Sequence, residues 1–271
     1  MKTIKKIRIT YLAIALIACS TINCKSQIKT NKQKKQQTTV EYPEAKLVYK
    51  GVGTLNEELQ GELQIALGNN DVEELTIVLQ KGANANKLPG NTDITPIMLA
   101  ETLEIAQLLL QNGADPLVSD VNGQNLLHYA VSKENAVDLI LLYVSLGVDV
   151  NARDHEEYTP LSLAIDYFDE ANAFDSQQVF VGNDNNQSND TKFKPDPQKT
   201  LKTLVKSGAD LNAFNQYGYT LLMDCVTKDN PNLVKILLEL GADKSIQNEY
   251  GQTAKDIAYK AGHRHIYQLL E

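Results

Sequence analysis

Residues 220–243 read TLLMDCVTKDNPNLVKILLELGAD, and this stretch decides the fold of the chain. Apolar residues occupy most of the circumference of a helix expected over 232–240, a pattern typical of a helix buried between neighbours. Thr220 can cap the free amide groups at the start of a first helix, which precedes the helix expected over 232–240. Gly241 can supply the left-handed backbone that ends the second helix. The stretch therefore predicts a pair of packed helices.

The same pattern recurs along the chain, which indicates an internal repeat. A glycine followed by Ala or Val and then Asp or Asn returns after 31, 34, 61 and 33 residues, at Gly82, Gly113, Gly147, Gly208 and Gly241. A second motif returns after 30, 34, 61 and 33 residues, at Thr95 (TPIMLA), Asn125 (NLLHYA), Thr159 (TPLSLA), Thr220 (TLLMDC) and Thr253 (TAKDIA). Both series share the spacing of 61, which is one period of 33 with 28 inserted residues. Further second helices are expected over 104–110, 137–144 and 201–205.

These motifs resemble the ankyrin repeat, with its T-P-L-H-x-A opening, Gly-His turn, apolar second helix and G-A-D-x-N exit. The match covers about residues 59–271, and the joint register of two motifs over five copies makes it specific. The resemblance implies an all-α solenoid of about six stacked helix-turn-helix repeats with hairpin tips. A single helix pair cannot cover its own apolar faces, so the pairs must stack, with atypical repeats at the ends.

The inserted residues fall between the two helices of the fourth repeat. Thr159 and Gly208 are 49 residues apart, whereas Thr220 and Gly241 are 21 apart. We expect a repeat domain over 57–271 with a flexible insertion at about 168–197. Calcium binding by side-chain oxygens of the insertion (Asp184, Asn186 and Asp190) is an alternative. The spaced Gly and the terminal Glu of a hand-type calcium loop are missing, however.

Residues 1–18 predict a signal peptide. Residues 1–8 are rich in Lys and Arg, and an apolar run of ten residues follows (ITYLAIALIA, 9–18). This run is too short for the span of about 20 residues that a bilayer requires. The end of this run, LIAC at 16–19, resembles the bacterial lipobox, which implies that Cys19 is lipidated and becomes the mature N-terminus. Cys24 is the alternative, and ordinary cleavage or retention as an anchor stays open. Residues 19–56 are expected to be a disordered basic tether that leads to the N-terminal cap.

Charge separates this tether from the rest of the chain. Nine of the 26 Lys and Arg residues precede residue 38, where there is no Asp or Glu. The remainder holds 17 cations against 34 acids, a formal charge of −17. Such an acidic surface repels phosphate backbones, so nucleic acid is excluded as a partner and a protein with a basic surface is expected. We expect a monomer in the bacterial cell envelope, facing the periplasm or the cell exterior.

Residues that could carry chemistry have structural explanations. His128 occupies the motif position whose histidine, in ankyrin repeats, hydrogen-bonds within and between repeats. His263 and His265 could share a metal, but no third ligand is suggested and zinc needs three or four. Cys225 stands where other copies have a small packing residue. Because catalytic motifs such as G-x-S-x-G and H-E-x-x-H are missing as well, we expect no enzyme, no cofactor and no metal.

The expected function is therefore binding. In proteins similar to this one, partners contact the hairpin tips and the exposed side of the first helices. The register maps these positions to thirteen residues: Arg153, His155, Tyr158, Asp166, Tyr167, Phe214, Gln216, Tyr217, Tyr219, Lys228, Glu249, Tyr250 and Gln252. Six of them are aromatic, as is common at protein interfaces, although rings that merely cover hairpin edges are the alternative explanation.

The sequence thus predicts an exported, lipid-anchored, non-catalytic protein-binding module. A toxin-neutralising immunity protein is an alternative within the binding class. An envelope stress or metal-binding enzyme that uses the insertion is the alternative from another class. A pocket with convergent polar groups and shifted pKa values would favour the enzyme, and a broad acidic and aromatic surface would favour the binding module.

Overall fold

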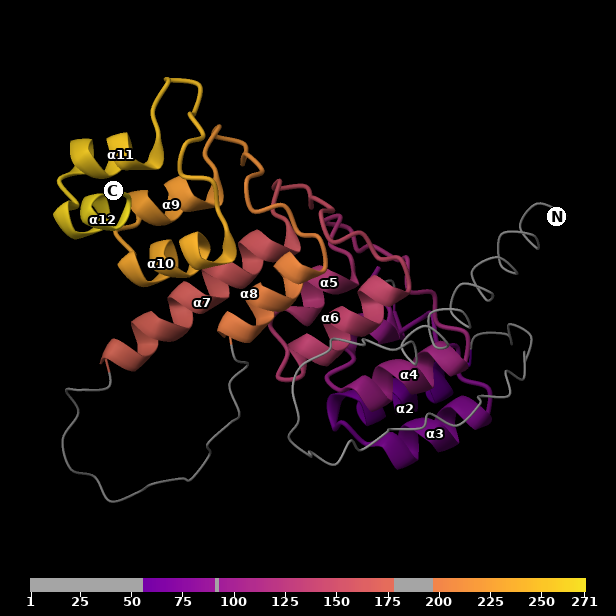
Figure 1. Ribbon diagram of the computed structural model, residues 1–271. Helices are drawn as coiled ribbons and strands as arrows, with labels where there is room; N and C mark the ends of the chain where they lie inside the picture. The colour runs from indigo at the N-terminus through magenta and orange to yellow at the C-terminus, as the bar shows by residue number, and fades with distance from the viewer. Residues whose placement is uncertain (1–55, 91–92, 178–196) are drawn as a thin grey trace, which may run out of the picture.

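The computed structural model describes residues 56–90, 93–177 and 197–271, so Cys19, Cys24 and the calcium-loop oxygens lie outside the described residues. The described helices form six consecutive pairs (Figure 1), in agreement with the expected number of repeats. The pairs are α2 (Glu57–Gly68) with α3 (Val72–Gln80), η1 (Pro96–Leu99) with α4 (Leu103–Gln111), α5 (Leu126–Ala130) with α6 (Ala136–Ser145), α7 (Pro160–Gln177) with α8 (Pro197–Lys206), α9 (Leu221–Thr227) with α10 (Pro231–Leu240), and α11 (Ala254–Ala261) with α12 (Arg264–Leu269). Among the described residues, no helix is long and apolar enough to cross a membrane.

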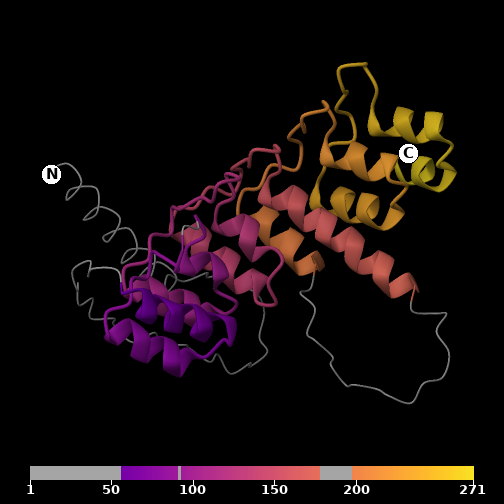
Figure 2. The same ribbon diagram turned by 180° about the vertical axis from the view of Figure 1, so that it is seen from behind.

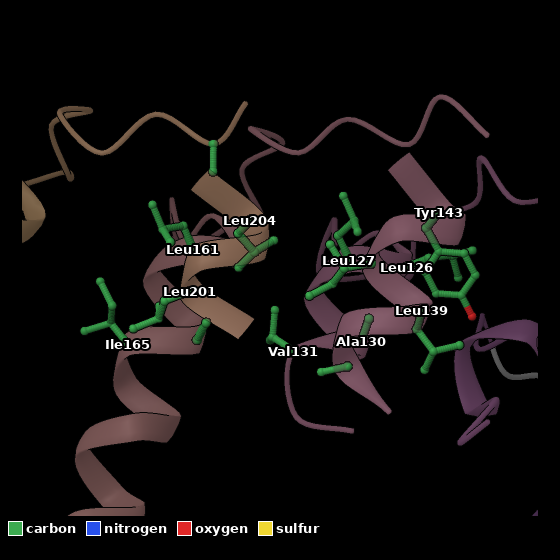
Figure 3. Close-up of a cluster of buried hydrophobic side chains, with 14 of the residues drawn as sticks. Leu126, Leu127, Ala130, Val131, Leu139, Tyr143, Leu161, Ile165, Leu201 and Leu204 are labelled. Atoms are coloured by element: carbon green, nitrogen blue, oxygen red, sulfur yellow. The ribbon is translucent and has the colours of Figure 1, made fainter. Parts of the chain in front are cut away.

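The pairs stack in a row, with α2 and α3 at one end and α11 and α12 at the other (Figures 1 and 2). The core runs through the whole row, because each pair buries apolar side chains against the next. Figure 3 shows this for the third and fourth repeats, where Val131 lies between the two helix pairs. Cys225 is completely buried in the same core, which confirms that it is a packing residue. The row is the all-α solenoid of stacked helix pairs that the repeat register predicts.

The helix ends follow the expected caps, with one exception. Gly241 ends α10 at a φ of 99°, and the side chains of Asn125, Thr220 and Thr253 accept hydrogen bonds from the first turns of α5, α9 and α11. Thr95 makes no side-chain cap hydrogen bond. The helix after it is a 3₁₀ turn, in which the Met98 amide already donates to the Thr95 carbonyl at 3.0 Å. The Thr95 amide in turn donates to Met98 Sδ at 3.4 Å.

His128 links the third repeat to the fourth, as its place in the motif predicts. Its Nε2 lies 3.1 Å from the carbonyl oxygen of Tyr158, which can only accept, so Nε2 carries the proton. Nδ1 lies 3.1 Å from the amide nitrogen of Asn125 and 2.8 Å from its Oδ1. Burial lowers the pKa of His128, against the opposing effects of the Tyr158 carbonyl, Asp154 and Asp120. The buried ring thus serves the contact between two repeats.

Asparagine side chains join the hairpins of neighbouring repeats. Asn86 donates to the Gly113 carbonyl at 2.7 Å and accepts from the Asp115 amide at 2.7 Å. Asn151 makes the same two bonds to Gly208 and Asp210, at 3.0 and 2.8 Å. The second set spans the insertion, so the fourth and fifth repeats stack in the ordinary way despite the extra residues.

The insertion departs from the expectation at its start. We expected an irregular excursion from about residue 168, but α7 continues as a helix to Gln177. The segment 168–177 (FDEANAFDSQ) contains no Gly or Pro that would end a helix, and its Ala and Glu residues favour one. Residues 178–196 lie outside the described part of the chain.

Candidate protein-binding surface

Four hairpins between repeats have tips of the same construction. In each, an Asp or Asn amide donates to the carbonyl four residues on, at 2.8–3.0 Å, in the tips 120–124, 154–158, 215–219 and 248–252. The side chain of that Asp or Asn accepts from the amides two and four residues on, as Asn215 does from Tyr217 and Tyr219. These bonds satisfy the backbone inside the tip, and the side chains two residues on (Asn122, Glu156, Tyr217 and Tyr250) are exposed. The hairpins project to the same side of the row (Figures 1 and 2).

Tyr217 and Tyr250 hold this outward position in the last two tips. Both are 68% exposed, and both lie two residues after the asparagine that closes the tip. A hydrogen bond to Glu249 raises the pKa of Tyr250. Phe214 is also exposed, whereas Tyr158 and Tyr219 are half-buried. Two of the predicted aromatic anchors, Tyr158 and Tyr219, are thus partly covered by the repeat stack, whereas the others are exposed to solvent.

Two predicted residues of the hairpin at 148–158 also hold neighbouring hairpins together. The Arg153 guanidinium donates to Glu157 Oε2 at 3.0 Å and to the Phe214 carbonyl at 2.7 Å. The His155 amide donates to the Asn122 carbonyl at 2.8 Å, and its ring packs on Gly123, where an added Cβ would lie 3.0 Å away. Gln216, Glu249 and Gln252 lie at the next two tips and are exposed or half-buried.

The four hairpins are strongly acidic. We call the exposed side chains of residues 114–124, 148–158, 209–219 and 242–252 the hairpin surface. These segments contain nine Asp or Glu and two cations, Arg153 and Lys244. Arg153 is bonded to Glu157, and Lys244 Nζ donates to the Leu270 carbonyl at 3.0 Å. The hairpin surface therefore combines exposed rings with carboxylates that outnumber the cations.

The other three predicted residues lie on the helices. Tyr167 is exposed on α7, while Lys228, at the end of α9, pairs with Asp166 of α7 and Asp224 of α9, each at 3.0 Å. Burial lowers the pKa of Lys228, but the hydrogen bonds to both carboxylates outweigh it and leave the pKa raised. Burial, followed by the charge of Asp166, raises the pKa of the Tyr158 hydroxyl. Lys228 and Asp166 are thus an ion pair between two repeats.

The sequence prediction missed part of the surface. Val121 and Leu117 are exposed in the hairpin that precedes the third repeat. Val121 follows the tip residue Asp120 directly, just as His155 follows Asp154, so the register alone could have identified it. The hairpin surface therefore begins one repeat earlier than the thirteen predicted residues suggest.

A carboxylate lies beside the two histidines of the last repeat. Asp229 Oδ1 is 3.0 Å from His263 Nδ1 and 3.4 Å from His265 Nε2. The sequence suggested no acidic partner for this pair. Over the residues that the structure describes, no group of three or more His, Cys, Asp or Glu side chains is arranged to hold a metal ion. The contact joins the turn of the fifth repeat to that of the sixth.

Comparisons with known proteins agree with the repeat architecture. Two family models match, described as ankyrin repeats (3 copies) over residues 101–186 and ankyrin repeats (many copies) over residues 204–258. A solved ankyrin repeat domain from Acinetobacter baumannii AYE has a TM-score of 0.55 at 20% identity, and the alignment covers 77% of this chain and 95% of that one. At this identity, the likeness shows the fold alone.

The curated relatives are longer proteins. Rabankyrin-5 of Mus musculus is 27% identical over 119 residues, which are 39% of this chain and 10% of that protein. Palmitoyltransferase AKR1 of Kluyveromyces lactis is 30% identical over 141 residues, which are 49% of this chain and 18% of that protein. The chain therefore spans less than a fifth of either relative. With six stacked helix pairs, two matching family models and solved structures of the same fold, this chain belongs to the ankyrin-repeat proteins.

Proposed function

We propose that this protein is a non-catalytic binding module, exported and lipid-anchored in the bacterial cell envelope, and that its hairpin surface binds a protein with a basic surface. The observation that carries the proposal is the coincidence of Tyr217 and Tyr250 with the acidic hairpins. Two equally exposed rings stand at the same position of successive tips, among segments with nine acids and two engaged cations.

The chemistry of this surface favours a protein partner. Tyrosine offers a large contact area at a low entropic cost, since only two torsions are fixed on binding. Acidic groups around the rings would attract a basic partner and speed encounter, with an effect that weakens as salt is added. The same charge disfavours nucleic acid. Asn215 and Asn248 fix the backbone of their tips, so little ordering would be needed on binding.

Replacing both Tyr217 and Tyr250 by alanine should shorten the lifetime of the complex. A ring buried at an interface centre commonly contributes about 2 kcal/mol or more, so the loss of even one such contribution should raise the dissociation rate about 30-fold. The partner would be isolated by pull-down from an envelope extract, and dissociation would be followed by surface plasmon resonance. Stability should change little, because both rings are exposed.

Leu141→Ala is the control, because Leu141 is also exposed but lies on α6, away from the hairpins. It should leave the dissociation rate unchanged. If the double variant recovers the partner with unchanged kinetics, the hairpin surface is not the binding face, and the outer helices or the insertion would take its place.

Membrane attachment is tested at the two N-terminal cysteines. Cys19→Ala should move the protein from the membrane fraction to the soluble fraction and abolish labelling by a radioactive fatty acid. A cysteine that carries more than one acyl chain anchors stably, whereas a single chain binds only marginally. Cys24→Ala is the control and should change neither property. The opposite pattern would assign the anchor to Cys24, and an unchanged membrane fraction in both variants would refute lipid anchoring.

A further inference from the structure

The last repeat exposes the face on which a seventh repeat would stack. Lys255, Tyr259 and Tyr267 stand at three repeat positions that are buried and apolar in the third to fifth repeats. The equivalent residues there are Leu127, Val131 and Ile140, then Leu161, Ile165 and Leu201, then Leu222, Val226 and Val234. Val131 lies between the third and fourth repeats in Figure 3, so these positions face the next repeat. We call Lys255, Tyr259 and Tyr267 the C-terminal end face.

The three side chains of the C-terminal end face contact one another. The rings of Tyr259 and Tyr267 lie 5.9 Å apart between centroids, and Lys255 Nζ lies 4.8 Å from the centre of the Tyr267 ring. The ammonium group of Lys255 thus covers the Tyr267 ring, whereas Tyr259 is 74% exposed. The end of the stack is an aromatic surface with a cationic edge.

The first repeat has a matching exposed face. Ile65 precedes the small residue Ala66, and the residues at its position in later repeats are Leu99, Tyr129, Leu163, Asp224 and Ile257, none of them fully exposed. On a helix this position lies about 200° from those of Lys255 and Tyr259, and so faces the previous repeat. Ile65 is 65% exposed because no repeat precedes it among the described residues. Ile77 of α3 is exposed as well.

The two ends carry opposite charge. Helices α2 and α3 contain five glutamates and no Lys or Arg. Helices α11 and α12 contain three cations (Lys255, Lys260 and Arg264) against Asp256. The cationic end is notable in a chain whose part after residue 38 has a formal charge of −17. Apolar contact and charge therefore both favour contact between the last repeat and the first repeat of another molecule.

We propose that the C-terminal end face binds the first repeat of a second copy, with Tyr259 of one molecule packed on Ile65 of the next. Such a junction repeats the geometry of an ordinary contact between repeats and continues the solenoid from copy to copy. It is heterologous, so each copy keeps one free end and the assembly grows with concentration. The monomer expected from the sequence would then be the state at low concentration only. The inference does not depend on the hairpin surface.

The test is sedimentation of the purified full chain over a range of concentrations. The wild-type chain should form species that grow with concentration, and added salt should reduce them. Ile65→Lys and Tyr259→Lys should each lower the association constant about tenfold or more, a change equivalent to about 1.4 kcal/mol. A mixture of these two variants should form dimers and nothing larger, because one intact first repeat meets one intact C-terminal end face.

Leu141→Lys is the matched control, because Leu141 is exposed on α6 in the middle of the row and should have no effect. Circular dichroism verifies that each variant is folded. A single species at every concentration would overturn the proposal, as would association unaffected by Ile65→Lys. The latter result would mean that another element, such as the residues before Asn56, covers the first repeat. Tyr217→Ala should not alter sedimentation, so failure here is distinct from failure of the binding function.

Discussion

Replacing Leu237 by alanine should lower the free energy of unfolding by about 2–5 kcal/mol, the usual cost of a cavity at a fully buried leucine. Leu237 is 0% exposed on α10, a helix that contacts α8, α9 and α12. The cavity would therefore affect the fourth, fifth and sixth repeats together. In a stack whose stability is a sum of repeat and interface contributions, the C-terminal repeats should unfold at lower urea concentration than the rest. Urea unfolding followed by circular dichroism measures this effect.

Leu141→Ala provides the comparison for Leu237→Ala. The substitution is the same and Leu141 also lies on the second helix of a repeat, but its side chain is 52% exposed on α6. It removes little buried area, so the free energy of unfolding should change by about 0.5 kcal/mol or less. Equal losses in the two variants would show that the burial pattern of the row is wrong.

The fold was predictable because the repeat constrains it many times over. Two motifs at matched spacings located the helix pairs, and an error at one copy would have been visible against the other four. The structure departs from the prediction where one repeat has a feature that the other repeats lack. Neither the 3₁₀ turn at Pro96 nor the extension of α7 to Gln177 has a counterpart in other repeats, so register offered no guidance there.

The sequence predicted which residues lie on the surface, but not which side chains they contact there. The register correctly placed all thirteen residues outside the core, where each is exposed or half-buried. It could not show that Lys228 is engaged by Asp166, because those residues are 62 apart and meet only through the stacking of α7 and α9. Asp229 meets His263 and His265 for the same reason. The end faces were also not predicted, since exposure of Ile65 and Tyr259 depends on what stacks beside them.

Removing the side chain that organises a hairpin tip should cause the second largest loss in the free energy of unfolding. Asp154, which is buried, accepts from the amides of Glu156 and Tyr158 at 3.0 and 2.9 Å and from Gln124 Nε2 at 3.0 Å. Asp154→Ala leaves these donors without their partner, and we expect a loss of about 2–3 kcal/mol in the free energy of unfolding. Because the Tyr158 carbonyl also accepts from His128, the contact between the third and fourth repeats should weaken too.

Asp154→Asn distinguishes this explanation from a simple loss of charge. Asn215 and Asn248 stand at the same position in the next two tips and accept the same pair of amide hydrogen bonds. The asparagine variant should therefore keep the tip and lose about 1 kcal/mol or less, mainly through the contact with Gln124. Urea unfolding gives both losses, and amide hydrogen exchange at Glu156 and Tyr158 reports the tip directly. If the Ala and Asn variants are equally destabilised, the carboxylate charge and not the tip hydrogen bonds stabilises this hairpin, and the common construction of the four tips would not explain their stability.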